Sequence, residues 1–413
     1  MERRRVVITG LGAVTPIGLT AMESWQAVKD GVCGVAPITQ FDPTGMKVQL
    51  AAEVKGFVPE NYMSKPEAKR MARFTQLAVV SAKEALENAG FTLDEAEADR
   101  CGVIVSSGIG GLFLTEAEHD KGKEKGWDRV SPFYIPMGIC NMAAGQIAIH
   151  TGFRGMCSCP VTACTGGTNA VGDAFHYIRD GYADVMLCGG AESAVTPLAI
   201  GAFTSMKALT QNPDPDRASI PFDAERSGFV LGEGAAILLL EELEHAKARG
   251  ARIYAEVVGY GATCDAYHMT APRPDGSGGA KAMEMAIADA GAKPEDVDYI
   301  NAHGTSTPLN DAGETAAVKT VFGDHAYQLA ISSTKSMTGH MLGAAGAVEA
   351  LFCALALQEG FLPATIHYQV PDPACDLDVV PNQGRSADLR YALSNSLGFG
   401  GHNGSLLFKK WEA

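Results

Sequence analysis

Positive charge is scarce in this sequence. Its 413 residues include 33 lysines and arginines against 48 aspartates and glutamates, a formal net charge of −15. Proteins that bind nucleic acid along the phosphate backbone usually present a basic surface, so the charge argues against a nucleic-acid partner. Uninterrupted apolar runs long enough to cross a bilayer are also lacking. The apolar run at residues 5–14 is broken by Gly10 and Gly12. It favours a strand entering a glycine turn over a signal peptide, and we expect a cytoplasmic protein with no membrane partner.

Several common cofactor and catalytic motifs are missing as well. P-loop, HExxH and GxSxG patterns do not occur. The stretch "TGLGAVTPIG" begins like a dinucleotide fingerprint, but Thr15 stands where the third glycine or alanine belongs. Ten cysteines are scattered along the chain, and the pair Cys157 and Cys159 has no second Cys/His pair at zinc-like spacing. We therefore expect no metal at Cys157, Cys159 and Cys164, and interpret most of the ten cysteines as small buried hydrophobic residues of a reducing compartment. The alternation in "CSCPVTAC" favours a strand.

Short β-rich runs alternate with helical patterns, which predicts an α/β protein. Residues 63–90 are predicted to form one long helix, with a capping box at Ser64 and Glu67 and a stop at Gly90. Residues 391–410 are predicted to form the final strand, after a loop-like region that is rich in proline and acidic residues.

The second part of the chain repeats the pattern of the first. Residues 253–268 resemble the start of the chain, 297–307 resemble 101–111, and 329–360 resemble 161–181. We infer an internal duplication whose halves, residues 1–250 and 251–413, meet in one compact body. Each half contributes one helix rich in small residues to the middle.

Cys164 is the candidate nucleophile. It lies where an apolar run ends and a helical pattern begins, and its neighbours are small: Ala163, Thr165, Gly166 and Gly167. The partial positive charge at a helix N-terminus stabilises a thiolate, and a sharp strand-to-helix turn exposes the side chain, as nucleophile elbows do for serine. The alternative is one more buried structural cysteine.

His303 and His340 both lie in turns rich in glycine and hydroxyl residues, at the ends of predicted strands. Such turns are where α/β proteins place ligands. Either histidine alone would more often be structural, but two in equivalent settings beside Cys164 favour a catalytic trio. Glu349 interrupts an otherwise apolar helix, and a buried carboxylate needs a partner. We expect Glu349 and Lys335 to support the histidines, the alternative for Glu349 being an exposed helix position.

Four motifs now occur in order: "VTACTGGTNAVGDAF", "NAHGTSTPLND", "STKSMTGHMLGAAGAVEA" and "NSLGFGGHNGSL". With them the chain resembles, over essentially its whole length, the elongating β-ketoacyl-[acyl-carrier-protein] synthases, most nearly their type II members. The resemblance implies a thiolase-like fold, with two duplicated halves in five αβαβα layers, and a homodimer. It also implies a decarboxylative Claisen condensation, without a cofactor, in which malonyl-acyl-carrier protein extends an acyl group on Cys164 by two carbons in fatty-acid synthesis.

The resemblance also implies roles for single residues. His303 and His340 would donate hydrogen bonds to the malonyl thioester oxygen. The backbone N–H groups of Cys164 and Phe399 would form the oxyanion hole, and Phe399 would gate the second substrate. Ile109 would limit or admit the acyl tail. Residues 131–137 would reach across the dimer.

Two further sites follow from the resemblance or from charge. Lys65, Lys69 and Arg70 offer a basic patch to the acidic carrier protein, the alternative being a solvated helix face. A monovalent cation is implied near three residues, Asn301, Glu349 and Asn395. One departure is the sequence Cys-Thr-Gly-Gly after the nucleophile, whose extra glycine loosens the first helical turn by up to ~1 kcal/mol. The leading rival is a ketosynthase of a type II polyketide pathway. A thiolase acting on CoA esters, a non-enzymatic chain-length partner and a cysteine hydrolase fit the residues less well.

Overall fold

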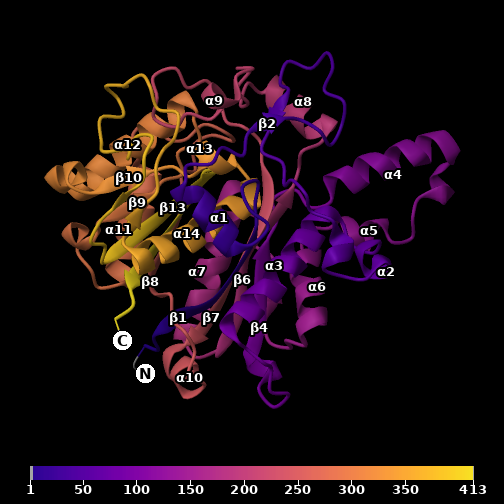
Figure 1. Cartoon of the computed structure of the whole chain (residues 1–413), viewed down its shortest axis with the longest axis horizontal. Helices are drawn as coiled ribbons and strands as arrows, with labels where there is room; N and C mark the ends of the chain where they lie inside the picture. Colours follow the sequence, from indigo (N-terminus) through magenta and orange to yellow (C-terminus); the bar gives the residue numbers. More distant parts are fainter. Residues whose placement is uncertain (1–2, 413) are drawn as a thin grey trace.

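The computed structural model describes residues 3–412 and contains one large mixed sheet with helices on its faces (Figure 1). The sheet strands of the first half are β1 (Val6–Val14), β4 (Cys101–Ser106), β5 (Cys157–Ser158), β6 (Val185–Ser193) and β7 (Glu233–Glu242). Those of the second half are β8 (Ala255–Cys264), β9 (Tyr299–Asn301), β10 (Ala330–Ser332), β13 (Tyr391–Gly398) and β14 (His402–Lys410). Two short pairs stand apart: β2 (Ala36–Pro37) with β3 (Leu50–Ala51), and β11 (Phe361–Leu362) with β12 (Arg385–Ser386).

The helices named in Figure 1 follow in chain order. In the first half they are α1 (Ala21–Lys29), α2 (Lys65–Ala68), α3 (Arg73–Ala89), α4 (Leu112–Lys125), α5 (Tyr134–Gly138), α6 (Met142–Thr151), α7 (Gly166–Arg179), α8 (Pro197–Ser205), α9 (Pro215–Ala218) and α10 (Leu243–Ala248). In the second half they are α11 (Ser277–Asp289), α12 (Pro308–Phe322), α13 (Lys335–Thr338) and α14 (Ala345–Glu359).

The strand order of the sheet confirms the internal duplication. It reads β10-β9-β13-β14-β8-β1-β7-β6-β4-β5, so each half has the same order outward from the β8–β1 junction. The directions match too: β1 pairs antiparallel with β7 as β8 does with β14, and β4 pairs parallel with β6 as β9 does with β13. The first half ends with β7 and the second begins with β8, so the two halves are joined within residues 243–254. The exact division at 250/251 stays a prediction.

The glycines of β1 lie inside the strand, so the predicted glycine turn is wrong. A Cβ at Gly10 would lie 2.2 Å from the carbonyl oxygen of Ala85, and one at Gly12 would lie 1.9 Å from that of Ser81. The second half repeats this contact. A Cβ added at Gly259 or at Gly261 would lie 2.0 Å from a carbonyl oxygen of α11. These glycines let α3 and α11 pack directly on the backbone of the strand beneath.

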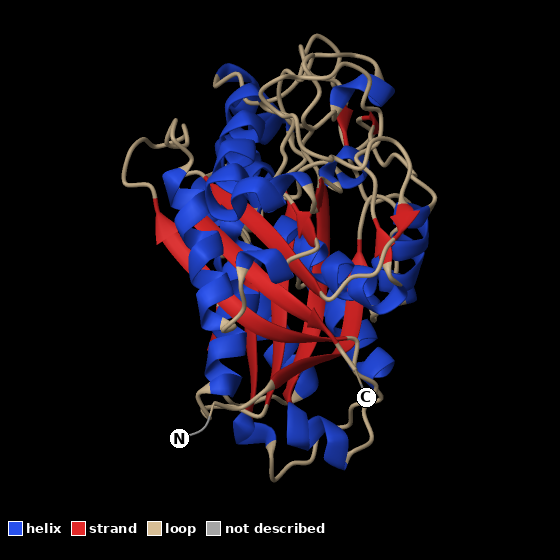
Figure 2. Cartoon of the chain, turned by 90° about the vertical axis from the view of Figure 1, so that its left-hand side faces the viewer, coloured by secondary structure: helices blue, strands red, loops and turns tan. Residues whose placement is uncertain are grey.

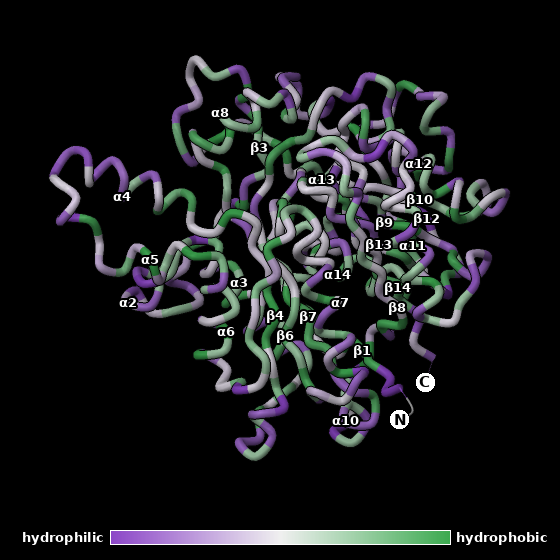
Figure 3. Tube along the Cα trace, turned by 180° about the vertical axis from the view of Figure 1, so that it is seen from behind, coloured by the Kyte–Doolittle hydropathy of each residue, from purple (hydrophilic) through white to green (hydrophobic). Residues whose placement is uncertain are grey.

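Five layers result. α7 and α14 lie between the two halves of the sheet, while α3 covers the outer face of the first half and α11 that of the second (Figures 1 and 2). Hydrophobic positions run along the central strands, and hydrophilic ones dominate the outer elements such as α4 (Figure 3). The predicted αβαβα arrangement is therefore confirmed.

The stretch Leu342–Glu359 is long and apolar enough to span a membrane by composition, contrary to the expectation from the sequence, but 89% of it is buried inside the protein. It comprises α14 and the turn before it, the central helix of the fold. Burial between two half-sheets accounts for its apolar character, and Glu349 lies within it.

The predicted helix over residues 63–90 is two helices, α2 and α3. The capping box at Ser64 and Glu67 and the left-handed C-cap at Gly90 are confirmed. Between the helices the chain turns, and Ala72 is extended. Arg73 starts α3 with its guanidinium held by the fully buried Glu233 at 2.8 Å, an ion pair that fixes where α3 begins.

The predicted final strand is a hairpin. β13 and β14 pair antiparallel and turn at Phe399, Gly400 and Gly401, where both glycines have left-handed φ. The turn lies at the cavity described below, and so brings the end of the chain to the site.

Candidate active site

Cys164 sits in a tight turn at the start of a helix. A 3-10 turn over Ala163–Thr165 leads directly into α7, and Ala163 has a left-handed φ of 51°. The predicted sharp turn into a helix is confirmed. The predicted strand directly before it and the exposure of the side chain are not, because β5 is only two residues long and ends at Ser158 and Cys164 is buried. The Thr165 hydroxyl donates to the carbonyl of His402 at 3.1 Å and ties the turn to β14. Cys164 is 7% exposed and lines a cavity of about 590 Å³.

The predicted lowering of the thiol pKa is wrong. Burial raises the pKa of Cys164 to about 12, and the Lys335 ammonium and the backbone N–H groups of Phe399 and Cys164 offset this only in part. Desolvation of a fully buried anion outweighs the field of the helix N-terminus. The thiol is therefore protonated at neutral pH until a base takes its proton.

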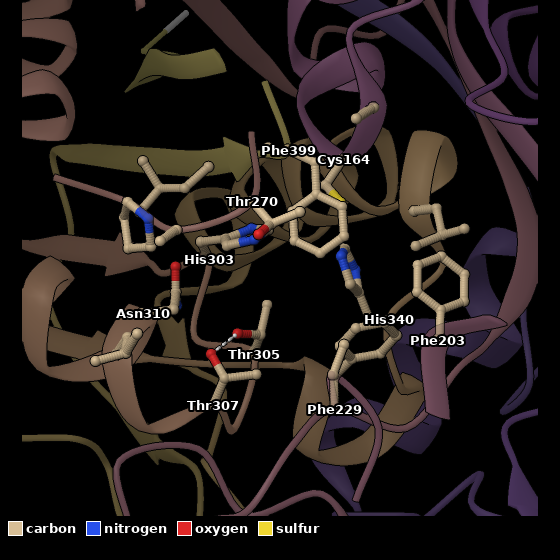
Figure 4. A pocket seen from close by; sticks show the side chains of 18 of the residues that line it. Cys164, Phe203, Phe229, Thr270, His303, Thr305, Thr307, Asn310, His340 and Phe399 are labelled. Carbon is tan, nitrogen blue, oxygen red and sulfur yellow. Dashed lines mark hydrogen bonds between the residues drawn. The ribbon is translucent and has the colours of Figure 1, made fainter. Parts of the chain in front are cut away.

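His303 and His340 line the same cavity as Cys164, and their rings converge on it (Figure 4). The two ring centroids lie 5.3 Å apart with the planes at 86°. His303 follows β9, and the buried Glu314 accepts its backbone N–H at 2.8 Å. His340 is fixed by its backbone, because its N–H donates to Val230 at 2.7 Å and its carbonyl accepts from Gly232 at 2.9 Å. Both rings are thus placed by backbone bonds that leave the side chains free to serve a substrate.

Both imidazoles are neutral. Burial lowers the pKa of His303 well below its usual value, and Lys335 and His340 lower it further. Burial and then Lys335 do the same to the pKa of His340. A neutral ring can accept the Cys164 proton or donate one N–H to a substrate oxygen.

Lys335 and Glu349 are both buried and in contact with each other, as predicted. Burial raises the pKa of Glu349 to about 7, the Lys335 charge opposes this, and the nearby Glu314 adds to it. Glu314 itself has a pKa raised by burial to about 7, which the N–H groups of Gly304 and His303 oppose. The buried Lys335 ammonium therefore lowers the pKa of two buried carboxyl groups, those of Glu349 and Glu314.

Glu314 is a residue that the sequence reasoning missed. It accepts the N–H groups of both His303 and Gly304 at 2.8 Å, and so holds the turn that carries the histidine. Its only signal in the sequence is an acidic residue on a helix next to the "NAHGTST" motif. Glu192 was missed for a similar reason: it accepts the N–H groups of Gly108, Ile109 and Gly343 from within the core.

Phe399 lines the cavity from the β13–β14 turn, and its ring lies near Cys164 (Figure 4). Its backbone N–H is one of the two that act on the Cys164 sulfur, which matches the expected pair of oxyanion donors. The Gly400 N–H donates to Met269 at 2.8 Å, so the turn is anchored to the loop after β8.

Ile109 lines the apolar side of the cavity and shares a cluster with Cys164, Phe203, Phe229 and Leu342. The polar side carries hydroxyl and amide groups, including Thr305 and Thr307, whose hydroxyls are 2.9 Å apart (Figure 4). An acyl tail would fit the first side and a polar chain the second.

The extra glycine after the nucleophile has a packing role. A Cβ at Gly166 would lie 1.9 Å from the Ser106 hydroxyl, which donates to the Pro160 carbonyl at 2.8 Å. A Cβ at Gly167 would lie 2.7 Å from the backbone nitrogen of Ala347 in α14. Both glycines let the first turn of α7 pack between β4 and α14.

Lys65, Lys69 and Arg70 are exposed at and just beyond α2. The Arg70 guanidinium lies 5.9 Å from the Phe133 ring centroid. The basic patch is thus available to a partner.

The residues expected to hold a monovalent cation fit that purpose in part. Asn301 Oδ1 and Glu349 Oε2 are buried oxygens without a hydrogen-bond partner among residues 3–412. Asn395 differs, because its Oδ1 accepts from Ser405 at 2.8 Å and its Nδ2 donates to Glu314 at 3.2 Å. Asn301 and Glu349 would supply the oxygen ligands, and the cation would add positive charge behind the histidines.

A thiol that can carry an acyl group, next to two uncharged imidazoles aimed at one cavity, is suited to acyl transfer with carbon–carbon bond formation. The duplicated five-layered fold around it is the thiolase-like fold. The class defined by fold and site is that of the condensing enzymes.

The comparisons with known proteins agree. Residues 3–246 match the family model "Beta-ketoacyl synthase, N-terminal domain" and residues 254–369 match "Beta-ketoacyl synthase, C-terminal domain". The chain is 52% identical to the 3-oxoacyl-[acyl-carrier-protein] synthase 2 of Synechocystis sp., covering 100% of this chain and 99% of the relative. The chain belongs to the β-ketoacyl synthase family.

Two solved structures are similar over 99% of this chain and 100% of theirs. One is the ishigamide ketosynthase/chain length factor, with a TM-score of 0.92 and 38% identity. The other shows a type II polyketide acyl-carrier protein in complex with its ketosynthase, with a TM-score of 0.91 and 36% identity.

Proposed function

We propose that the protein condenses malonyl-acyl-carrier protein with an acyl group held on Cys164, releasing CO2 and lengthening the chain by two carbons in fatty-acid synthesis. The observation that carries this proposal is the single cavity shared by Cys164, His303, His340 and Phe399. Higher identity to the Synechocystis synthase, 52%, than to the ketosynthase of the type II polyketide complex, 36%, favours the fatty-acid pathway over the polyketide alternative.

In the first half-reaction a neutral imidazole takes the Cys164 proton and the sulfur attacks the acyl thioester carbon. The backbone N–H groups of Cys164 and Phe399 stabilise the oxyanion that forms. The C–S bond to the carrier then breaks, the carrier leaves as a thiol with the proton, and the acyl group stays on Cys164.

In the second half-reaction the malonyl group loses CO2, and the electron pair of the broken C–C bond becomes an enolate. His303 and His340 each donate an N–H to the enolate oxygen, which is where charge develops. The enolate carbon attacks the acyl carbon, the C–S bond to Cys164 breaks, and the sulfur leaves as a thiolate that takes up a proton from water to restore the thiol. Burial, and then the charge of Lys335, lowers the pKa of both rings and so keeps them neutral.

The acyl-carrier protein is the proposed partner, with Lys65, Lys69 and Arg70 as its docking patch. Exposed lysines and an arginine on a protein of net charge −15 form a local attraction for an acidic partner. A carrier protein is bound to its ketosynthase in one solved neighbour.

A homodimer in the cytoplasm is also part of the proposal. β5 is the edge strand of the sheet, and large apolar side chains are exposed around it and on the neighbouring α4–α6 region. They are Phe113, Trp127, Phe133, Ile135, Ile149 and Val161. A second copy would cover both the edge and this apolar surface, and residues 131–137 would lie within the contact. Sedimentation equilibrium of the full chain tests this, and a monomer at micromolar concentration would contradict it.

The experiment that tests the function is incubation with acyl-carrier proteins of graded acyl length, followed by malonyl-carrier protein. Mass spectrometry should find the acyl mass on the peptide that carries Cys164, and malonyl addition should convert it to a 3-oxoacyl product with CO2 release. Acylation at another residue, or thioester hydrolysis without condensation, would overturn the proposal.

A further inference from the structure

A second group of potential ligands lies away from the catalytic cavity. Cys33 follows α1, Asp216 lies in α9, and His367 follows β11. One donor atom of each, a sulfur, an oxygen and a nitrogen, lies within 4.8 Å of the others. It is the one such group of three found within residues 3–412, and none of its members lines the cavity around Cys164.

The donors of this group are poorly used by the protein itself. His367 Nδ1 is buried without a hydrogen-bond partner in the described part of the chain, and its Nε2 lies 3.4 Å from Asp216 Oδ1. The Cys33 sulfur has a long contact of 4.0 Å to the Pro215 carbonyl and is also acted on by the Val35 N–H. His367 also has a left-handed φ of 63°, which is uncommon for a residue other than glycine. Strained backbone and unsatisfied buried atoms together indicate a ligand site.

The charge around the group suits a cation. Asp214 and Asp216 both act electrostatically on His367. The Arg217 guanidinium donates to the His367 carbonyl at 2.7 Å, and its charge is paired with Asp223 at 3.1 Å and Glu225 at 2.7 Å. Burial raises the pKa of the Cys33 thiol, and the Val35 N–H and Lys55 ammonium oppose that rise. A divalent cation on the sulfur displaces the thiol proton outright.

We propose that Cys33, Asp216 and His367 bind one Zn²⁺ ion, with the fourth position open to water. Sulfur, imidazole nitrogen and carboxylate oxygen are the ligands that zinc takes, at about 2.0–2.3 Å, which places neighbouring donors roughly 3.5 Å apart. Because the donors lie within 4.8 Å of one another, zinc binding needs a closing of no more than about 1.3 Å between them. Asp216 can supply it, because its side chain is 73% exposed.

The zinc would join three segments, each of which donates a hydrogen bond to α13. Next to Cys33, the Gly34 N–H donates to the Met337 carbonyl at 2.7 Å. Close to Asp216, the Ser219 hydroxyl donates to the Lys335 carbonyl at 2.8 Å. Next to His367, the Ile366 N–H donates to the Ser336 hydroxyl at 3.0 Å.

α13 carries Lys335 and leads to His340. A bound zinc therefore braces the helix that positions the electrostatic support of the catalytic histidines. This role is independent of the condensation chemistry, and its test does not need a substrate.

The test is a Zn²⁺ titration of the metal-stripped full chain against a chromogenic competitor. The wild type should bind one Zn²⁺ per chain, and Co²⁺ in its place should give thiolate-to-cobalt charge-transfer absorption. Cys33→Ser and His367→Asn should each weaken Zn²⁺ binding about 100-fold or more. Asparagine is chosen at position 367 because it tolerates the left-handed φ there, so that this variant should still fold.

Cys164→Ala and Cys264→Ala are the matched cysteine controls and should bind Zn²⁺ like the wild type. Loss of binding in Cys164→Ala, or unchanged binding in Cys33→Ser and His367→Asn, would overturn the site. Hydrogen exchange gives the second measurement: Zn²⁺ should slow exchange across α13 in the wild type and not in Cys33→Ser. Equal exchange with and without zinc would overturn the bracing of α13.

Discussion

The rings of His303 and His340 meet edge to face, with centroids 5.3 Å apart and planes at 86°. Both lie in turns of the second half of the chain: His303 follows β9 and His340 follows α13. Burial and the Lys335 charge hold both rings neutral. Two hydrogen-bond donors can therefore converge on one oxygen without two positive charges having to share the space.

Replacing either histidine should mainly slow decarboxylation. A donor aimed at developing charge is worth ~3 kcal/mol, so His303→Ala and His340→Ala should each lose roughly 100-fold or more in condensation. The rate of CO2 release from malonyl-carrier protein, measured on enzyme already acylated, reports this step. A variant whose condensation stays within twofold of the wild type would remove that residue from the donor pair.

The neutral histidines also make a pH prediction for stability. An unfolded chain protonates its histidines below a pKa of about 6.5, whereas the buried rings of His303 and His340 stay neutral. The unfolded state then binds more protons, so these rings contribute stability above pH 6.5 that is lost as the pH falls. The difference in Tm between the wild type and His340→Gln should narrow steadily from pH 7 to pH 5. A constant difference would contradict the lowered pKa.

The reactivity of Cys164 should rise with pH without levelling near neutrality. Because burial raises the thiol pKa to about 12, the thiolate fraction grows about tenfold per pH unit up to that value. Iodoacetamide labelling, followed peptide by peptide, should show this slope between pH 7 and 10. The exposed Cys264 is the internal control. A plateau in Cys164 labelling near pH 7 would mean that the sulfur is ionised at rest.

Much of this arrangement could be predicted from sequence, and the failures have physical causes. The duplication was visible because each half repeats its glycines and strand ends, and those glycines proved to be contact points with α3 and α11. Cys164, His303 and His340 were found because they interrupt glycine-rich turns. Glu314 and Glu192 were missed because each acts by accepting backbone N–H groups that are distant in sequence or on another element. The predicted lowering of the Cys164 pKa was wrong because the sequence pattern of a helix start does not show how deeply the thiol is buried.

Gly166 should resist replacement despite its position in a helix. Alanine normally gains ~1 kcal/mol over glycine in a helix, but here its Cβ would meet the Ser106 hydroxyl at 1.9 Å. We expect Gly166→Ala to destabilise the protein by ~1–3 kcal/mol, and Ser106→Ala in the same chain to recover most of the loss. Gly201→Ala in α8 is the matched control, because nothing lies within 4 Å of its added Cβ. Equal Tm shifts for the two glycine variants would refute the packing role.

Charge reversal at Lys65 and Lys69 should weaken docking of the carrier protein. The double change Lys65→Glu and Lys69→Glu should raise KM for acyl-carrier protein and leave kcat nearly unchanged, and the effect should shrink as salt is added. The control carries the same charge change on the other half of the molecule, as Lys281→Glu with Lys293→Glu. If the two double variants behave alike, net charge rather than a docking patch controls the KM.

Ile109 should set the length of the acyl chain that the cavity accepts. It lies in the apolar cluster with Cys164, Phe203 and Leu342, and its backbone is fixed by the Ile109 N–H donating to Glu192 at 3.1 Å. Its side chain lines the cavity. In Ile109→Phe the larger ring fills part of the space that the acyl tail would use. Acylation of Cys164 by long-chain carriers should therefore fall at least tenfold, while acylation by short-chain carriers is kept. Mass spectrometry of the acylated peptide, across carriers of graded length, measures the profile. Ile109→Val keeps a small β-branched side chain and should retain the wild-type profile; an unchanged profile in the phenylalanine variant would place the acyl tail elsewhere.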